Sequence, residues 1–355
     1  MAFPEFDPGK QKLLFFSRGR GRGHAIPDAE IVKELHELRD DLDVRFVSYG
    51  TGARTIQQLG HPLVDLGLPD DNPLFDTVIL AGKMIGWLQP QLVVAHEEFA
   101  VLPAAKIFDR KVLFLTDWFV EETDLRMGML RFADQVLFLD EEEIYEEPSC
   151  VRGRIAYLDP IVRDLRYARK DKEHARAQLG IPAGAFVVGV FPGSPPEQRE
   201  PIVDLVLEAL HYLPPNAVLH WVGGSDTELL SRLADSHERV HFCPQHQDIG
   251  QYYVACDAAI TKATRKTLLE LEYLGIPSVS LTHGYNRIDD RRARSLGNTR
   301  LIEAKSITAQ ELAALLTAQA ASEPAPSSLK PGAAARRAAH CISAHLGQIG
   351  DVAAV

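Results

Sequence analysis

One stretch near the N-terminus limits the possible folds more than any other part of the sequence. Residues 12–17 form a mostly apolar run that ends in serine, a pattern typical of a buried parallel strand. Residues 18–23 alternate arginine with glycine, and His24 ends this loop. Pro27 then suits the first turn of a helix. A strand that leads through a glycine loop into a helix predicts a ligand-binding edge of an open α/β sheet.

The alternation of strand-like and helical segments continues along the chain. In the first half, further apolar runs of strand length occur at 43–49, 62–66, 91–95, 112–115 and 136–139. In the second half they recur at 186–191, 217–222, 240–242, 258–260 and 278–281. Strands that alternate with helices predict parallel sheets covered on both faces. The predicted fold class is therefore α/β, with two doubly wound Rossmann-like domains.

Three segments are predicted along the chain. Residues 1–163 form an N-terminal domain and residues 164–318 a second domain, separated by a charged and polar stretch. Residues 319–355 form a linker rich in alanine, proline and serine, followed by a C-terminal helix from about Ala333 to Leu346. A length of 355 residues fits two domains at roughly 150 residues each.

Composition excludes several functional classes. A net charge of −11 argues against general nucleic-acid binding, and the arginine–glycine run is better explained as a loop than as an RNA-binding segment. The N-terminus lacks the pattern of a signal peptide, and no apolar run approaches the ~20 residues of a membrane span. The four cysteines are scattered and have no zinc-binding spacing. We expect a cytoplasmic protein with free thiols, no metal site and at most peripheral membrane contact.

Polar residues gather where the predicted strands end, and in a parallel sheet these ends share one edge. His24 lies at that edge, and an imidazole titrates near neutral pH, so His24 is the candidate general base. His96, Glu97 or Asp117 could orient it from neighbouring strands. A helix-capping role for His24 and salt-bridge roles for the other three residues are the alternatives.

Two segments of the second half are candidates for binding an anion. The turn at Gly193 and Ser194 follows a strand and precedes a helix, where backbone amides can bind phosphate. Another helix begins with hydroxyl and basic side chains, Thr264, Arg265, Lys266 and Thr267. Cations at a helix N-terminus oppose the macrodipole, so they suggest an anionic partner such as a diphosphate. Glu270 on this helix could accept hydrogen bonds from ribose. Salt-bridged or solvent-facing positions are the alternatives.

The order of these motifs resembles that of GT-B glycosyltransferases, and most closely glycosyltransferase family 28. That family includes the N-acetylglucosaminyltransferase of peptidoglycan synthesis and related antibiotic glycosyltransferases. The resemblance covers roughly residues 12–315 and depends on Gly-x-Gly-His-x-x-Pro at 21–27 and Leu-Glu-Leu-Glu-Tyr-Leu-Gly-Ile-Pro at 269–277. It implies two domains that face each other across a cleft, and an inverting, metal-independent transfer from a nucleotide-diphosphate sugar, with UDP as the expected nucleotide.

The resemblance implies roles for residues of the first domain. His24 matches the histidine that is the proposed base in some members, and Gly21 and Gly23 match glycines that approach the donor or acceptor. His96 and Glu97 lie where related enzymes hold an aspartate that orients the histidine. The resemblance does not explain the loop arginines Arg18, Arg20 and Arg22. Binding of an anionic acceptor and assistance to the diphosphate are the two candidate roles for them, and Asp117 is a further candidate for contacting the acceptor or the diphosphate.

In the second domain, Gly193 and Ser194 match the family's Gly-Ser turn, and Glu270 matches its ribose-binding glutamate. The donor loop at 262–267 differs from the family pattern because it contains no glycine. Asp289 lies where the family has a residue pair that contacts the donor sugar. No cofactor is implied beyond the nucleotide sugar as co-substrate.

Three functions remain open from the sequence. The leading one is a transferase that acts on a hydroxyl of a small molecule or a lipid-linked sugar. A nucleotide-sugar epimerase or hydrolase of the same fold is the second, because acids end several strands, namely Glu97, Glu98, Asp117 and Asp140. The third is a non-catalytic protein that binds sugar nucleotides, suggested by the altered donor loop. A Rossmann dehydrogenase is disfavoured, since the glycine spacing differs from G-x-G-x-x-G.

Overall fold

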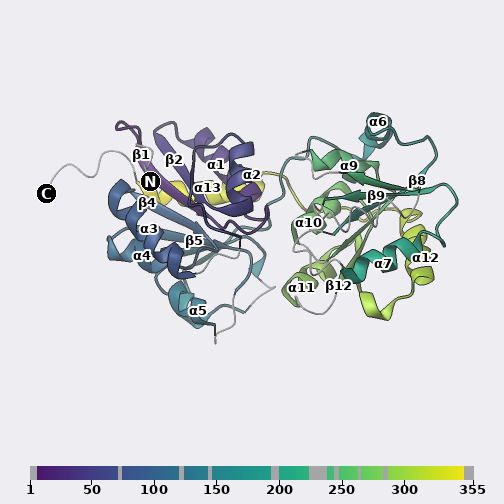
Figure 1. Cartoon of the computed structure of the whole chain (residues 1–355). Coiled ribbons are helices and arrows are strands. Elements are labelled where there is room, and N and C mark those ends of the chain that lie inside the picture. Colours follow the sequence, from purple (N-terminus) through teal and green to yellow (C-terminus); the bar gives the residue numbers. More distant parts are fainter. Residues whose placement is uncertain are drawn as a thin grey trace. The chain divides into compact units, whose positions relative to one another are not determined.

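Two compact units make up the chain (Figure 1). The computed structural model describes residues 6–70, 74–119, 124–142, 146–192, 200–223, 238–243, 248–262, 265–282 and 287–347. The first unit comprises Met1–Arg163 and Pro331–Val355, and the second comprises Asp164–Lys330. The first division falls after residue 163, where the sequence places a boundary. The segment 319–355, expected as a separate linker and helix, is instead shared between the two units.

The described part of the first unit contains one parallel sheet of seven strands in the order β3-β2-β1-β4-β5-β6-β7. The strands are β1 (Gln11–Ser17), β2 (Leu42–Ser48), β3 (Leu63–Asp65), β4 (Leu92–His96), β5 (Lys111–Thr116), β6 (Gln135–Phe138) and β7 (Ile155–Tyr157). The helices are α1 (Ala25–Leu38), α2 (Gly50–Gln58), α3 (Leu74–Leu88), α4 (Val101–Ile107), α5 (Leu125–Leu130) and α13 (Ala333–Leu346). Strand order reverses between β1 and β4, so the loops after these strands diverge there. Open α/β sheets bind ligands at such a position.

Strand β1 is apolar from Leu13 to Phe16 because both of its faces are covered. Leu13 and Phe15 are buried in the core that also contains residues of α1 and α13. Leu14 and Phe16 are buried in a second core that contains residues of α3 and α4. Successive side chains of a strand point to opposite faces, so a strand covered on both faces needs apolar residues at every position. Burial of each such side chain contributes about 1.5–3 kcal/mol.

The described part of the second unit has the same construction, with six parallel strands in the order β10-β9-β8-β11-β12-β13. The strands are β8 (Phe186–Phe191), β9 (Ala217–Val222), β10 (Val240–Cys243), β11 (Ala258–Lys262), β12 (Ser278–Thr282) and β13 (Thr299–Glu303). The helices are α6 (Lys172–Gln178), α7 (Glu200–Ala209), α9 (Ile249–Ala255), α10 (Arg265–Leu274), α11 (Arg287–Ser295) and α12 (Ala309–Ala320). The strand order again reverses in the middle, between β8 and β11. The predicted α/β class with two doubly wound domains is therefore confirmed.

Helix α13 belongs to the first unit although it follows the second in sequence. Its buried face consists of small alanines and Ile342, which lie in the same core as apolar residues of α1. The backbone N–H of Gly332 donates to the Val162 carbonyl (3.1 Å), and Arg336 on the helix donates to Glu34 on α1 (2.8 Å). The end of the chain thus completes one face of the first sheet.

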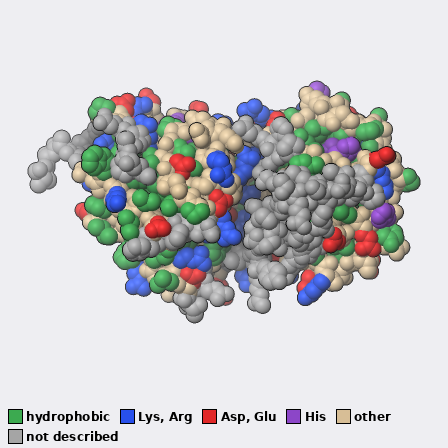
Figure 2. All heavy atoms as spheres, in the orientation of Figure 1, with side chains coloured by type: hydrophobic (Ala, Val, Ile, Leu, Met, Phe, Trp, Pro, Cys, Tyr) green, Lys and Arg blue, Asp and Glu red, His purple; other side chains and the backbone are tan. Residues whose placement is uncertain are grey.

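Contact with a membrane depends on the helices of the chain, and contact with charged partners depends on its surface charge. None of the described helices combines the length and the hydropathy that crossing a bilayer requires. On the face of the molecule seen in Figure 2, acidic and basic side chains are interspersed over the first unit. The chain as a whole carries a net charge of −11.

Candidate active site

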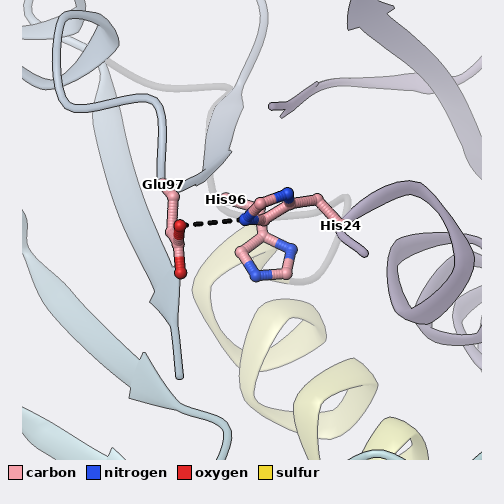
Figure 3. A group of neighbouring side chains, drawn as sticks. All are labelled: His24, His96 and Glu97. Atoms are coloured by element: carbon pink, nitrogen blue, oxygen red, sulfur yellow. Dashed lines mark hydrogen bonds and ion pairs between the residues drawn. The ribbon is translucent and has the colours of Figure 1, made fainter. Parts of the chain in front are cut away.

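The candidate site lies at the carboxyl ends of β1 and β4. His24 ends the loop after β1 and occupies the N-cap position of α1, but its side chain makes no capping hydrogen bond. Strand β4 ends at His96, and Glu97 and Glu98 follow it directly. The parallel pairing of β1 with β4 places Ser17 opposite His96, so the two loops begin side by side. Figure 3 shows His24, His96 and Glu97 gathered at this edge.

Glu97 is the orienting partner of His24. Its carboxylate Oε2 lies 2.9 Å from His24 Nε2 and also accepts from Arg18 Nη1 at 3.1 Å. The Glu97 side chain is only 3% exposed, and the residue adopts a positive φ of 54°. A left-handed backbone is unfavourable for glutamate and needs support from the surrounding structure. Here the Glu97 N–H donates to the Leu115 carbonyl of β5 at 3.0 Å.

The charges around Glu97 keep its carboxyl ionised, and this fixes which nitrogen of His24 faces it as a donor. Burial alone would raise the pKa of Glu97, but His24, His96 and Arg18 lower it well below its ordinary value. An ionised carboxylate only accepts hydrogen bonds, so the Nε2 atom of His24 must carry the proton and donate it. Nδ1 of His24 is then the unprotonated nitrogen in the neutral ring. It is buried and has no hydrogen-bond partner among the residues that the structure describes.

His96 is not a second partner of the same kind. Its Nδ1 lies 2.6 Å from Oδ1 of Asp28, and both side chains are completely buried. The ring of His96 contacts the ring of His24 edge-to-face, with centroids 4.7 Å apart and planes at 78°. Sequence reasoning missed Asp28, which reads as an ordinary acidic residue in the first turn of a helix. The sequence feature that could have identified Asp28 is its spacing, because Asp28 lies one helical turn after His24.

A second buried carboxyl adjoins the first. Glu98 accepts a hydrogen bond from the Tyr49 hydroxyl at 2.7 Å, and burial raises the pKa of Glu98 to about 7. Tyr49 also packs against the glycine loop, because a Cβ on Gly19 would lie 2.3 Å from the Tyr49 ring. Gly19 is therefore required for this close approach. The Glu98–Tyr49 pair connects the end of β4 to the loop that carries His24.

Three other predicted residues of the first unit, Gly21, Arg22 and Asp117, lie in the loops that follow β1 and β5. Arg22 donates to Gln58 at 3.4 Å, and Gly21 adopts a positive φ of 71°, which glycine accepts without strain. Asp117 follows β5 at the same edge of the sheet. Three residues were predicted to orient His24, namely His96, Glu97 and Asp117. In the structure, Glu97 forms the hydrogen bond to His24. Arg18, whose role the sequence leaves open, contacts this same carboxylate.

The predicted donor residues of the second unit are only partly described. Gly193, Ser194, Thr264 and the side chain of Asp289 lie outside the described residues. Arg265, Lys266 and Thr267 form the first turn of α10, and Arg265 is buried. Glu270, one turn later, is also buried, and its Oε2 accepts a hydrogen bond from the Tyr253 hydroxyl at 2.9 Å. Tyr253 thereby fixes the orientation of this carboxylate.

The donor atoms around His24 could in principle hold a metal ion. His24, His96 and Glu97 each offer one ligand atom, and these atoms lie within 4.8 Å of one another. Oε2 of Glu97 already accepts hydrogen bonds from Arg18 and His24. Nδ1 of His96 is hydrogen-bonded to Asp28. These contacts engage one donor atom of each residue, namely Oε2 of Glu97, Nε2 of His24 and Nδ1 of His96. The expectation of a site without metal stays a prediction.

No protein-family model matches the chain, but curated relatives do. An enzyme of Chlorobium phaeobacteroides is 25% identical over 331 residues, which cover 84% of this chain and 87% of the relative. An enzyme of Desulforudis audaxviator is 25% identical over 339 residues, covering 86% of this chain and 89% of the relative. Both are named UDP-N-acetylglucosamine–N-acetylmuramyl-(pentapeptide) pyrophosphoryl-undecaprenol N-acetylglucosamine transferase.

Solved structures match over almost the whole chain. The glycotransferase of kitacinnamycin has a TM-score of 0.68 at 17% identity and covers 96% of this chain and 100% of its own. A protein of Listeria monocytogenes assigned as a UDP-N-acetylglucosamine 2-epimerase has a TM-score of 0.69 at 15% identity, covering 95% and 96%. Anabaena HepE, solved with UDP, has a TM-score of 0.61 at 19% identity, covering 95% and 96%. The predicted resemblance is thus confirmed: the chain has the GT-B fold and is similar in sequence to the family 28 glycosyltransferases.

Proposed function

We propose that this chain is an enzyme that transfers a sugar from a UDP-sugar to a hydroxyl acceptor, with inversion and without a metal ion. The observation that carries the proposal is the hydrogen bond between His24 Nε2 and the ionised Glu97 carboxylate, which leaves Nδ1 as the basic nitrogen. The glycosyltransferase class is supported by the curated relatives, whose names specify transfer of N-acetylglucosamine from UDP.

The first unit would supply the base. The acceptor hydroxyl gives its proton to Nδ1 of His24, which is buried in this structure and must be uncovered as the acceptor binds, while the acceptor oxygen attacks the anomeric carbon. The bond between that carbon and the diphosphate oxygen breaks, and the electron pair leaves with UDP. Glu97 stabilises the imidazolium that forms, because its carboxylate already accepts the Nε2 proton. A single displacement of this kind inverts the anomeric configuration.

The second unit would bind the donor. Arg265 and Lys266 stand at the N-terminus of α10, where basic side chains and the helix dipole both favour the charge of a diphosphate. This arrangement supplies positive charge to the leaving group without a metal ion. Glu270, oriented by Tyr253, would accept the ribose hydroxyls. UDP is the proposed nucleotide because the relatives use it and HepE was solved with it.

The test is a transfer assay on the full chain with UDP-N-acetylglucosamine as the donor. The acceptors are a panel of small hydroxyl compounds and a lipid-linked muramyl acceptor, and UDP release is measured with the anomeric configuration of the product. The proposal expects acceptor-dependent UDP release, unaffected by EDTA, and a product of inverted configuration. A product of retained configuration would refute the mechanism. Binding of UDP without turnover over the whole panel would favour the non-catalytic alternative.

An epimerase or hydrolase is the second candidate. It is favoured by the epimerase among the structural neighbours and by the two adjacent buried carboxyls. Glu97 is held ionised, whereas the pKa of Glu98 is about 7. Carboxyls whose pKa values are pushed apart can act as a base and an acid. Incubation with UDP-N-acetylglucosamine and no acceptor separates the two functions, because only this second candidate predicts rapid formation of an epimer or free sugar.

A further inference from the structure

We propose that Asp28 and His96 form a positioning pair that holds the His24 ring in the orientation in which Nε2 faces Glu97. The proposal rests on the proposed function, in which that orientation leaves Nδ1 as the base. Neither Asp28 nor His96 touches the reacting atoms in this account. Their task is to support the ring of His24 through a contact in which the supporting side chains are fully buried.

The pair is deeply buried and tightly bonded. Asp28 lies in the first turn of α1, and its Oδ1 is 2.6 Å from Nδ1 of His96 at the end of β4. Both side chains have no solvent exposure. The second oxygen of Asp28 is buried without a hydrogen-bond partner among the described residues. Two titratable groups in such surroundings are costly relative to an apolar pair, so the fold alone gives little reason for them.

Three contacts connect this pair to His24. The His96 ring packs edge-to-face against the His24 ring at 4.7 Å. The backbone N–H of Asp28 donates to the carbonyl of His24 at 3.1 Å, which fixes the residue that carries the ring. His96 also precedes Glu97 directly, and its charge helps to lower the pKa of that carboxyl. His24 is therefore held by Glu97 through one nitrogen and by His96 through the ring.

The variants that test the pair are Asp28→Asn and His96→Asn. Asp28→Asn removes the carboxylate but keeps the size of the side chain. His96→Asn retains an amide that can donate to Asp28 but removes the ring that contacts His24. A control of matched kind is Asp257→Asn in the second unit, because Asp257 accepts from Lys172 at 2.5 Å and from Arg176 at 2.7 Å. This control loses an ion pair of comparable geometry far from His24 in the sequence.

The measurement is long-range ¹H–¹⁵N spectroscopy of the full chain labelled with ¹⁵N-histidine, with the His24 signals assigned from a His24→Gln sample. The spectra report which ring nitrogen carries the proton. The wild-type chain and the Asp257→Asn control are expected to show the Nε2–H form of His24. In Asp28→Asn and His96→Asn we expect the Nδ1–H form to become comparably populated. The kcat for transfer should fall about twofold or more while KM stays unchanged, because about half of the chains or fewer then hold Nδ1 as the free base.

The outcomes separate a positioning role from a structural one. If both variants lower Tm but keep His24 in the Nε2–H form, the pair only stabilises the fold and the proposal is wrong. If a variant does not fold, an NOE spectrum of the wild-type chain tests the proposal instead. A ring-to-ring NOE between His24 and His96 supports the proposal, and its absence overturns it. Absence of transfer in the wild type would refute the proposed function but leave these spectra interpretable.

Discussion

The Nε2 atom of His24 lies 2.9 Å from Oε2 of Glu97, although 73 positions separate the two residues in the sequence. The parallel pairing of β1 with β4 produces this contact, because both strands end at the same edge where the strand order reverses. Glu97 accepts from Arg18 as well, so one buried carboxylate connects a base to a cation.

Replacing Glu97 with glutamine should reduce turnover strongly. The amide keeps the shape of the side chain but cannot stabilise the imidazolium of His24, and its N–H₂ group can donate to Nε2 and reverse the tautomer. We expect kcat to fall about 100-fold or more, with little change in the Kd for UDP. Steady-state kinetics and isothermal titration calorimetry give the two values. Glu97→Asp, which retains the charge, should lose less activity, and an equal loss in both variants would contradict the role of the charge.

Glu98 should make stability depend on pH. Its pKa is raised from 4.5 to about 7 in the folded chain because the carboxyl is buried. Between these values the folded chain binds more protons than the unfolded chain, so the stabilising contribution of Glu98 is complete below the unfolded pKa and is lost as pH rises to about 7. Glu98→Gln, which can still accept from Tyr49, should remove this dependence. Its free energy of unfolding should improve relative to the wild type from about pH 5 to pH 8.

Urea unfolding at several pH values measures this effect. Glu323→Gln is the control, since Glu323 is exposed and its substitution should leave the pH dependence unchanged. Parallel curves for the wild type and Glu98→Gln across this range would show that the folded-state pKa of Glu98 is not raised.

Glu270 should contribute to nucleotide binding rather than to the chemical step. Glu270→Gln is expected to raise the Kd for UDP about 10-fold, because a charged acceptor for the ribose hydroxyls becomes neutral. Tyr253→Phe removes the hydrogen bond that orients the carboxylate and should have a smaller effect in the same direction. Calorimetry with UDP measures both variants. An unchanged Kd in Glu270→Gln would place the ribose elsewhere.

Helix α13 should be necessary for the stability of the first unit. Ile342 on this helix is completely buried, and Ile342→Ala is expected to lower the free energy of unfolding by about 2–4 kcal/mol. His340 is exposed on the same helix, so His340→Ala should change it by less than about 0.5 kcal/mol. Chemical denaturation followed by circular dichroism compares the two. Equal effects of the two substitutions would mean that α13 does not pack on the first unit.

Much of the fold could be predicted from the sequence because the local patterns agree with the final structure. The apolar run of 12–17 predicts a strand covered on both faces, and β1 (Gln11–Ser17) is one. The placement of α13 could not be predicted, because its buried face is mostly alanine and such a face fits many partners. Only the completed first sheet shows where those small side chains pack.

The sequence predicts those residues of the candidate site that stand at the ends of strands. It does not predict the contacts that depend on how separate elements pack together. His24, His96 and Glu97 stand at the ends of recognisable elements, so the sequence placed them at one edge. Both His96 and Glu97 contact His24, but only Glu97 is hydrogen-bonded to it among the described residues, and its positive φ is a feature that no local pattern indicates. The partners Asp28 and Tyr49 are set by packing between α1, β2 and β4, so neither could be identified from the sequence.

The most direct test of the account is a comparison of His24→Ala with the wild type in two measurements on the full chain. These are kcat for transfer from UDP-N-acetylglucosamine to the best acceptor of the panel, and the Kd for UDP. We predict that kcat falls about 100-fold or more while the Kd changes less than about twofold, because a general base acts in the chemical step and not in donor binding. An equal loss of turnover and UDP binding, or no loss of either, would contradict the assignment of His24 as the base.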